Sequence, residues 1–360
     1  MKVPSLYVCS LDSFCGKSMF CLGLALTMRE KGLKVGYFKP VGWEMARDLK
    51  GRRIDEDAQL MKEILNLKVP LNVVSPIVLG ARFLEERSKI DPNAAEQRVL
   101  QSYERASEGM DIMILEGPQS LGVGTSIGVD CISLTKKLGS RTVLISKVDN
   151  DAVIDKILLT KTFMDAVSVD FIGAILNCIP KTSLERIKGY ATPILREHHI
   201  NVLGVMPDNV SIRAPTVGEI CENITCTVLT RKDKMDLLVE DLLVGAMTPE
   251  SALSYFRRSL RKAVITGGDR AGVQLAALQT DTSVLILTGN IYPDVRILAR
   301  AEELGVPVLL VPYDTFTTVK EVANLSGRIK PRDTKKIELA KNLVTEYVDW
   351  KSILNSLVRP

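Results

Sequence analysis

The sequence predicts an α/β protein with a parallel sheet covered by helices on both faces, followed by a second, smaller α/β domain. Three observations predict this fold class. Strand-like segments alternate with helix-like segments, and the strands are apolar throughout, which is typical of parallel strands buried on both faces. A Gly-Lys-Ser sequence at residues 16–18 stands between the first strand and the first helix. A second strand–helix series begins at Ala263.

The first domain is predicted over residues 1–215. Acidic residues open the helix at 55–64, and Asp91-Pro92 precedes the helix at 93–108, as expected of helix N-termini. Residues 70–79 are predicted as a loop or an extended stretch. The predicted strands are 6–9, 34–41, 110–117, 142–146, 169–176 and 202–206, and the predicted helices are 19–31, 55–64, 93–108, 128–138, 152–164 and 184–197.

Residues 216–235 are predicted as a linker, and residues 236–330 as the second domain. Residues 331–360 are predicted as a C-terminal helical segment. The second domain is expected to contain strands at 263–267, 283–287 and 306–311, and helices at 249–260, 274–278, 294–304 and 317–323.

Composition excludes several classes of partner. The 360 residues are 46% hydrophobic and 25% charged. The net charge is +4 and residues of both signs are interspersed, so no nucleic-acid partner is expected. The seven cysteines form no C-x-x-C motif, which indicates free thiols in a reducing compartment. No signal peptide or membrane-spanning run is found. We therefore expect a cytoplasmic protein with no membrane partner.

The first strand, its loop and the helix that follows form the pattern of a P-loop. Ser10, Ser13, Cys15 and Gly16 are expected to bind the phosphates of a nucleotide, with Lys17 reaching the terminal phosphates. The Ser18 hydroxyl is expected to ligate magnesium. The common pattern has Gly where this chain has Leu11; Ser10 fits a longer loop in which Ser replaces the opening Gly. An ordinary helix start at Gly16-Lys17 is the alternative.

Parallel sheets bind ligands at the carboxyl ends of their strands, which places Lys17, Lys39, Glu116 and Asn177 along one edge. Glu116 is the candidate metal-linked acid, or else a cap of the following turn. Lys39 is expected beside the phosphates, or else as a solvated lysine at a strand end.

Two further positions have open alternatives. Asp57 or Asp55 is a candidate second magnesium ligand, although an acid at a helix start is often only a cap. Asn177, together with Pro207, could bind an adenine ring through amide hydrogen bonds. The alternative is that Asn177 only forms a turn.

Several segments together resemble dethiobiotin synthetase in order and spacing. They are Ser10–Ser18, Phe38–Val41, Asp55–Ala58, Leu115–Gly117, Gly173–Asn177 and Leu203–Pro207. The resemblance implies an ATP and Mg²⁺ site with Lys17, Ser18, Asp57 and Glu116 as its residues. It also implies a role in the reaction for Lys39 and an adenine contact for Asn177.

The departures from that family lie mostly on the substrate side. Ser10 replaces the opening Gly of the loop, and Phe14 replaces its glutamate. Gly42-Trp43 stands near the position of the family's serine, and Pro118-Gln119-Ser120 replaces a glycine-rich turn.

The segment Thr266–Gly272 resembles the signature of the DRTGG domain, a regulatory module. Gly267 and Gly268 allow a tight turn, and Arg270 offers an anion partner, so Gly267, Gly268, Asp269 and Arg270 are the candidate regulatory ligand site. A plain βα turn capped by Asp269 is the alternative. The whole chain resembles the N-terminal part of long phosphotransacetylases without their catalytic domain, so acetyltransferase activity is not expected.

Three functions remain open. The first is a regulatory protein that responds to Mg-ATP, with a small-molecule effector at the second domain. The second is an ATP-dependent ligase acting on a carboxylate or an amine, in which Lys39, Asp57 and Glu116 serve phosphoryl chemistry. The third, raised by Ser10 and Phe14, is a structural subunit of a separate catalytic partner chain. A homo-oligomer is expected because proteins of this class often pair.

Overall fold

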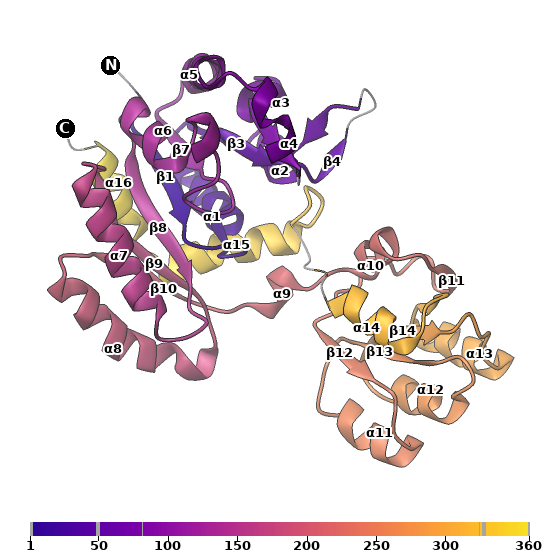
Figure 1. The fold of residues 1–360 in the computed structure, drawn as a ribbon. Helices are drawn as coiled ribbons and strands as arrows, with labels where there is room; N and C mark the ends of the chain where they lie inside the picture. Colours follow the sequence, from indigo (N-terminus) through magenta and orange to yellow (C-terminus); the bar gives the residue numbers. More distant parts are fainter. Residues whose placement is uncertain (1–2, 48–50, 81, 324, 326–328, 359–360) are drawn as a thin grey trace. The chain divides into compact units, whose positions relative to one another are not determined.

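The structure is a computed structural model that describes residues 3–47, 51–80, 82–323, 325 and 329–358 (Figure 1). The chain divides into two compact units. The first consists of Met1–Asp208 and Ile329–Pro360, and the second of Asn209–Arg328. The predicted fold class is confirmed in both: each unit is a mainly parallel sheet with helices on its two faces.

The first unit contains a six-stranded sheet whose strands are all parallel. Strand β1 lies between β7 and β8, and every residue of β1 is buried, as its apolar sequence predicts. In spatial order the strands are β10 (Val202–Pro207), β9 (Phe171–Ile179), β8 (Arg141–Lys147), β1 (Ser5–Ser10), β7 (Ile112–Glu116) and β2 (Val35–Phe38).

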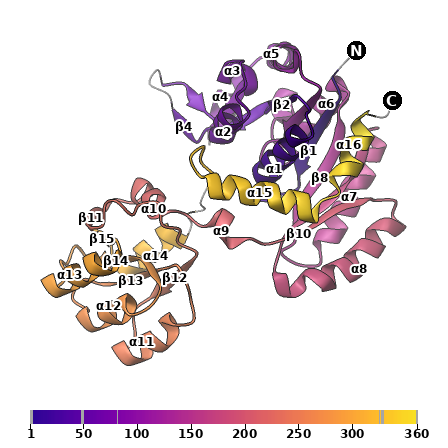
Figure 2. The ribbon, with the colours of Figure 1, turned by 180° about the vertical axis from the view of Figure 1, so that it is seen from behind.

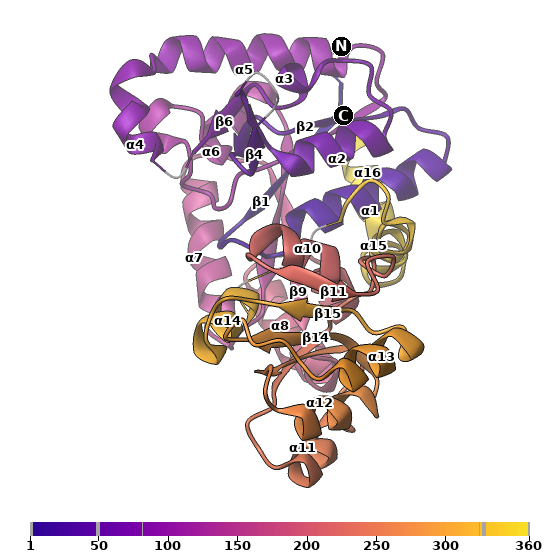
Figure 3. The same cartoon turned by 90° about the vertical axis from the view of Figure 1, so that its right-hand side faces the viewer.

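Helices cover both faces of this sheet. Figure 3 shows α7 and α1 on opposite sides of β1. One face packs against α5 (Pro92–Ser107), α6 (Cys131–Leu138), α7 (Val153–Ala166) and α8 (Leu184–Glu197). The other face packs against α1 (Lys17–Glu30), α15 (Thr334–Tyr347) and α16 (Trp350–Val358). Among the described residues, no helix combines the length and apolar character that crossing a membrane would need.

Short elements surround the end of β2. Residues 70–79, predicted as a loop or an extended stretch, contain a short helix, α3 (Leu71–Val74), and an extended strand, β6 (Ile77–Leu79), which pairs with β3 (Val41–Trp43). The apolar side chains of this segment are buried: Val73, Val74 and Leu79. The remaining elements here are β4 (Ala46–Arg47), β5 (Arg53–Ile54), α2 (Glu56–Ile64) and α4 (Phe83–Glu86).

The second unit contains a five-stranded sheet in which only β11, at one edge, is antiparallel. In spatial order the strands are β11 (Thr227–Thr230), β15 (Val308–Leu310), β14 (Thr282–Thr288), β13 (Lys262–Gly267) and β12 (Asp241–Val244). One face packs against α11 (Pro249–Phe256), α12 (Ala271–Leu278) and α13 (Val295–Leu304), and the other against α10 (Val217–Asn223) and α14 (Thr315–Ala323). A short helix, α9 (Val210–Arg213), begins the unit.

The predicted linker at 216–235 is wrong. It contains α10 and β11, which belong to the second unit. Val217 and Ile220 are buried against the sheet core, and Thr216 with Glu219 forms a capping box at the start of α10. These are features of a folded domain. The sequence pattern does not reveal them because α10 and β11 are both short.

The second unit is an insertion in the chain of the first. After it, residues 331–360, predicted as a C-terminal helical segment, return to the first unit as α15 and α16. Figure 2 shows α15 running beside α1. The backbone N–H of Asp349 donates to the carbonyl of Leu203 in β10 (2.7 Å), which fixes the end of this segment to the sheet.

We expect Gly23→Val to destabilise the first unit. Gly23 lies where α1 crosses α15, and a Cβ there would lie 2.4 Å from the carbonyl oxygen of Ala340. Because the obstacle is backbone, we expect the free energy of unfolding to fall by about 3 kcal/mol in urea denaturation. The control is Gly189→Ala in α8, where a Cβ meets nothing within 4 Å; it should be neutral or stabilising. Equal unfolding curves for wild type and Gly23→Val would contradict the close crossing.

Candidate nucleotide-binding site

The loop between β1 and α1 has the backbone conformation of a tight, glycine-dependent turn. Gly16 has φ +83°, and a Cβ on it would lie 2.3 Å from Nδ2 of Asn177. That amide donates to the carbonyl of Cys15 at 2.8 Å, so Asn177, near the end of β9, holds the loop. Phe14 is also left-handed, with φ 57°, and its side chain is 79% exposed.

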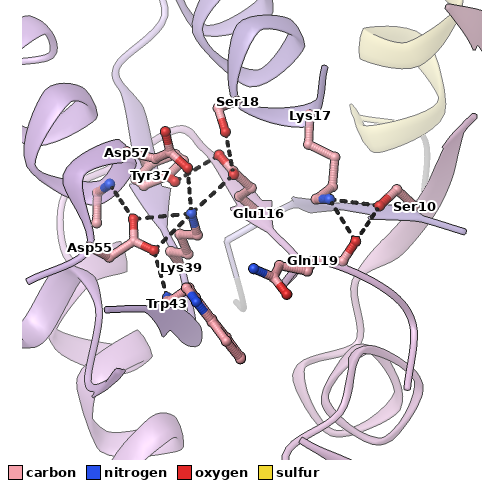
Figure 4. A network of polar contacts seen from close by, with 11 residues as sticks. Ser10, Lys17, Ser18, Tyr37, Lys39, Trp43, Asp55, Asp57, Glu116 and Gln119 are labelled. Atoms are coloured by element: carbon pink, nitrogen blue, oxygen red, sulfur yellow. Dashed lines mark hydrogen bonds and ion pairs between the residues drawn. The ribbon is translucent and has the colours of Figure 1, made fainter. Parts of the chain in front are cut away.

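Lys17 begins α1 and is buried to 8% exposure. Its ammonium donates to Oγ of Ser10 at 2.6 Å and to the carbonyl of Gln119 at 3.4 Å (Figure 4). Both acceptors are neutral oxygens. An anion near the loop would therefore give this ammonium a stronger partner than the ones it has here.

The second residue of α1, Ser18, is bonded to the acid that ends β7. Its hydroxyl donates to Oε1 of Glu116 at 2.7 Å, while the Tyr37 hydroxyl donates to Oε2 at 2.9 Å. Glu116 is only 1% exposed. Burial raises the pKa of Glu116, and the nearby Asp57 and Asp55 add to the rise against the opposing effect of Lys39.

Lys39, directly after β2, lies among three carboxylates. Its Nζ is 2.8 Å from Asp57, 3.0 Å from Asp55 and 3.3 Å from Glu116. Burial by itself would lower the pKa of Lys39, but the three carboxylates outweigh it and hold that pKa well above its ordinary value. One ammonium thus faces three acids in a nearly closed environment, and the negative charge is in excess (Figure 4).

The two aspartates at the start of α2 have different surroundings. Asp55 is 1% exposed and is the N-cap of α2: it accepts from the backbone N–H of Ala58 (2.9 Å) and of Trp43 (2.8 Å). Asp57 lies in the first turn, with its side chain 21% exposed. Both aspartates contact Lys39, and Asp57 is the more exposed of the two.

The carboxyl ends of β1, β2 and β7 bring together the residues Ser10, Lys17, Ser18, Lys39, Asp57 and Glu116. Ser13 and Cys15 lie in the loop itself, and the Cys15 thiol donates to the carbonyl of Asp12. Pro207 is buried at the end of β10. Asn177 is 2% exposed and contacts the loop, so its assignment to adenine stays a prediction.

Tyr37 and Gln119 also contact the site residues, although neither is among those predicted from the sequence. Tyr37 precedes Lys39 by two residues in an extended segment, so the two side chains point to the same face of the strand. This two-residue spacing is a sequence signal that could have identified Tyr37. The main-chain role of Gln119 has no sequence signal, because any residue provides a carbonyl.

The candidate residues of the second unit form a tight turn after β13. A Cβ on Gly268 would lie 1.7 Å from the carbonyl of Ile291, so the turn packs directly against the chain after β14. Asp269 and Arg270 are exposed, and Arg270 donates to the carbonyl of Met247 at 2.9 Å. The N-cap of α12 is Arg270, without a side-chain cap, so Asp269 does not cap this helix as its alternative role required.

The donor set of the first unit fits magnesium. Mg²⁺ prefers hard oxygen ligands and is usually held by one or two carboxylates together with phosphate oxygens and water. Ser18, Asp57 and Glu116 offer such oxygens beside an excess of negative charge. Within the described residues no group of three or more His, Cys, Asp or Glu side chains is arranged to hold a metal by itself.

Gly16→Ala tests the geometry of the loop. The strained backbone costs about 1 kcal/mol for any L-residue, and the new methyl would displace the Asn177 amide from the Cys15 carbonyl. We expect a larger loss of unfolding free energy than for Gly32→Ala, whose φ is +87° but whose Cβ would meet nothing within 4 Å. Equal losses in chemical denaturation would show that Asn177 does not hold the loop.

Comparison with known proteins agrees with this organisation. The profile of the AAA domain family matches residues 4–216, and that of the DRTGG domain matches residues 219–325. The phosphate acetyltransferase of Nitratidesulfovibrio vulgaris is 24% identical over 375 residues, which cover 98% of this chain and 52% of that protein. The chain thus spans about half the length of the curated phosphate acetyltransferases it matches.

A second type of relative matches just over half of this chain. The ATP-dependent dethiobiotin synthetase BioD of Methanocaldococcus jannaschii is 27% identical over 210 residues, 56% of this chain and 92% of that protein. Among solved structures, cobyrinic acid a,c-diamide synthase of Mycobacterium smegmatis is 14% identical, with a TM-score of 0.36, over 57% of this chain and 88% of the other.

These matches confirm the expected resemblance to the N-terminal part of long phosphotransacetylases. Over residues 4–216 the chain belongs to the AAA domain family, and a DRTGG domain follows it at residues 219–325.

Proposed function

We propose that this chain is a regulatory protein that binds Mg-ATP in its first unit and responds to it. The observation that carries the proposal is the hydrogen bond between Ser18, in Gly16-Lys17-Ser18, and the buried acid Glu116. A P-loop turn, a buried lysine and a strand-end acid are the parts that P-loop proteins use to hold a nucleotide polyphosphate. The amides of the loop and the N-terminus of α1 would face the phosphates.

Each side chain has a distinct task in this proposal. Lys17 would exchange its neutral acceptors for the terminal phosphates, and Ser18 would turn its hydroxyl hydrogen away from Glu116. Ser18, Asp57 and Glu116 would hold the magnesium ion, whose charge offsets that of the phosphates. Lys39 offsets part of the negative charge of Asp57 and Glu116 before the ligand arrives.

The relay to the second unit is proposed through the helix that follows it. Helix α1 begins at Lys17 and packs against α15, which is the first helix after the inserted unit. A nucleotide-induced change at the N-terminus of α1 would therefore be felt by α15, and the chain that precedes α15 belongs to the second unit. The turn at Gly267–Arg270 is the proposed site of a small-molecule effector, and the protein is proposed to act as a homo-oligomer in the cytosol.

Amide hydrogen exchange of the full chain, with and without Mg-ATP, tests the proposal. We expect slower exchange in the loop at residues 10–18 and altered exchange in α15 and in the second unit. Protection of the loop alone would contradict the relay but not nucleotide binding. Unchanged exchange throughout at saturating nucleotide would contradict both.

An ATP-dependent ligase is the second candidate, favoured by Lys39 among three acids and by the match to 92% of a dethiobiotin synthetase. Such an enzyme would release ADP only when a second small molecule, a carboxylate or an amine, is added. A screen that finds no compound stimulating ADP formation would favour the regulatory function.

Affinity for Mg-ATP should fall as the pH is lowered. Burial raises the pKa of Glu116 above its ordinary value of 4.5, and the protonated acid cannot ligate a cation. Below that raised pKa we expect about tenfold weaker binding per pH unit. Calorimetric titration over a pH series checks this, with Glu116→Gln expected to bind weakly and without this pH dependence. A wild-type profile identical to that of Glu116→Gln would contradict the assignment.

A further inference from the structure

Two of the seven cysteines lie together in the second unit. Cys221 is in the last turn of α10, and Cys226 directly precedes β11. The helix ends at Asn223, and Ile224 is extended with φ −122° and ψ 148°, so the chain leaves the helix axis between the two cysteines. Both side chains pack, half-buried, against the same hydrophobic cluster under the sheet.

The two thiols lie close enough together to change each other's pKa. Interaction with the Cys221 thiol lowers the pKa of Cys226, although burial opposes the effect, and interaction with Cys226 raises the pKa of Cys221. The pair therefore has an attacking sulfur, Cys226, and a second sulfur beside it that can resolve a mixed disulfide.

The other five cysteines differ from this pair. Four are buried in the first unit: Cys9, Cys15, Cys21 and Cys131. Burial raises the pKa of Cys9 and of Cys21, which makes them poor nucleophiles. Cys178 is half-buried, but it lies in β9 of the first unit. In the described part of the chain, no group of three or more metal-binding side chains surrounds any site, so the pair has no further ligands for a closed metal centre.

We propose that Cys221 and Cys226 are a redox modification site that forms a reversible intramolecular disulfide with a low-molecular-weight disulfide as oxidant. The thiolate of Cys226 attacks one sulfur of the oxidant and releases the first small thiol. Cys221 then loses its proton and attacks the Cys226 sulfur, which releases the second small thiol. Two thiol protons and two electrons leave the protein, and the oxidant is reduced to two thiols.

The bond would tie the end of α10 to the start of β11, the edge strand that pairs antiparallel with β15. It would close a ring of chain from residue 221 to residue 226 and limit the movement of α10 against the sheet. This inference is independent of nucleotide binding, since the pair lies in the second unit and the candidate nucleotide site in the first.

The test is oxidation of the reduced full chain in glutathione buffers of increasing ratio of disulfide to thiol, followed by alkylation and tryptic mass mapping. Cleavage after Arg213 and Arg231 releases residues 214–231, which contain Cys221 and Cys226 and no other cysteine. We expect this peptide to become lighter by two hydrogens and to escape alkylation, while peptides with the other cysteines stay alkylated. Reduction with dithiothreitol should restore alkylation.

Single variants separate an internal disulfide from simple reactivity. In Cys221→Ser, Cys226 should accumulate bound glutathione, because its resolving partner is missing. In Cys226→Ser, Cys221 should react much more slowly, and Cys178→Ser should behave as wild type. Full alkylation of both cysteines at the most oxidising ratio would overturn the proposal, as would stable glutathione on Cys226 of the wild type.

Discussion

Lys39→Met is expected to cause the largest loss of stability of any single replacement in the site. The side chain of Lys39 is 5% exposed and is the cation shared by Asp55, Asp57 and Glu116. Methionine keeps a similar volume but leaves the buried carboxylates unopposed. Removing one partner of a buried charge cluster costs about 3–5 kcal/mol, so we expect the melting temperature at pH 7 to fall by about 10 °C.

The pH dependence of this loss identifies its cause. Without Lys39, burial and mutual repulsion raise the pKa values of Asp55 and Glu116 further above their ordinary values of 3.8 and 4.5. A carboxyl whose pKa is raised in the folded state binds more protons when folded than when unfolded. The variant should therefore regain stability as the pH falls through these raised folded-state pKa values. The control is Lys188→Met, which removes an exposed pair with Glu185 and should change little. A defect that is independent of pH would indicate lost packing instead.

Lys17→Ala is expected to remove binding of Mg-ATP almost completely. The Lys17 ammonium is a buried cation at the end of the loop, and its two contacts, with Ser10 and with the carbonyl of Gln119, are ones that phosphate oxygens can replace. Loss of charge-assisted bonds to phosphate should weaken binding by at least about 100-fold, or about 2.7 kcal/mol. Fluorescence titration with a labelled ATP analogue measures this.

Lys156→Ala is the matched control for Lys17→Ala. Lys156 forms an exposed ion pair with Asp12 of the same loop (3.3 Å), so it carries the same charge close to the site without lying inside it. Its replacement should weaken binding only slightly. Equal losses for both variants would mean that the general positive charge of the region, and not the P-loop lysine, attracts the nucleotide.

Much of the first unit could be predicted because its strands are uniformly apolar. The run from Leu6 to Cys9 is fully buried in β1, and Glu116, which ends β7, lies beside Ser18, the second residue of α1. Strand ends and helix starts are local features, so sequence patterns place them at one edge of a parallel sheet. The two-residue spacing of Tyr37 and Lys39 is a local signal of the same kind.

The parts that could not be predicted depend on contacts between distant segments. Nothing local distinguishes Asp55, whose carboxylate caps α2 and binds the Trp43 amide, from the more exposed Asp57; both contact Lys39. The return of α15 to α1 rests on a close approach at Gly23, which has no sequence signature. The segment at 216–235 was misread because α10 and β11 are short, and their burial is decided by the sheet of the second unit.

Titration calorimetry of the full wild-type chain with ATP and with GTP, each with magnesium and with a chelator, tests the central claim most directly. The account predicts that ATP binds with magnesium present and binds much more weakly with the chelator, because Asp57 and Glu116 then repel the phosphates. No binding heat with either nucleotide in the presence of magnesium, at several temperatures, would contradict the account. The loop from Ser10 to Ser18 would then be a structural turn, and the function would have to be sought elsewhere in the chain.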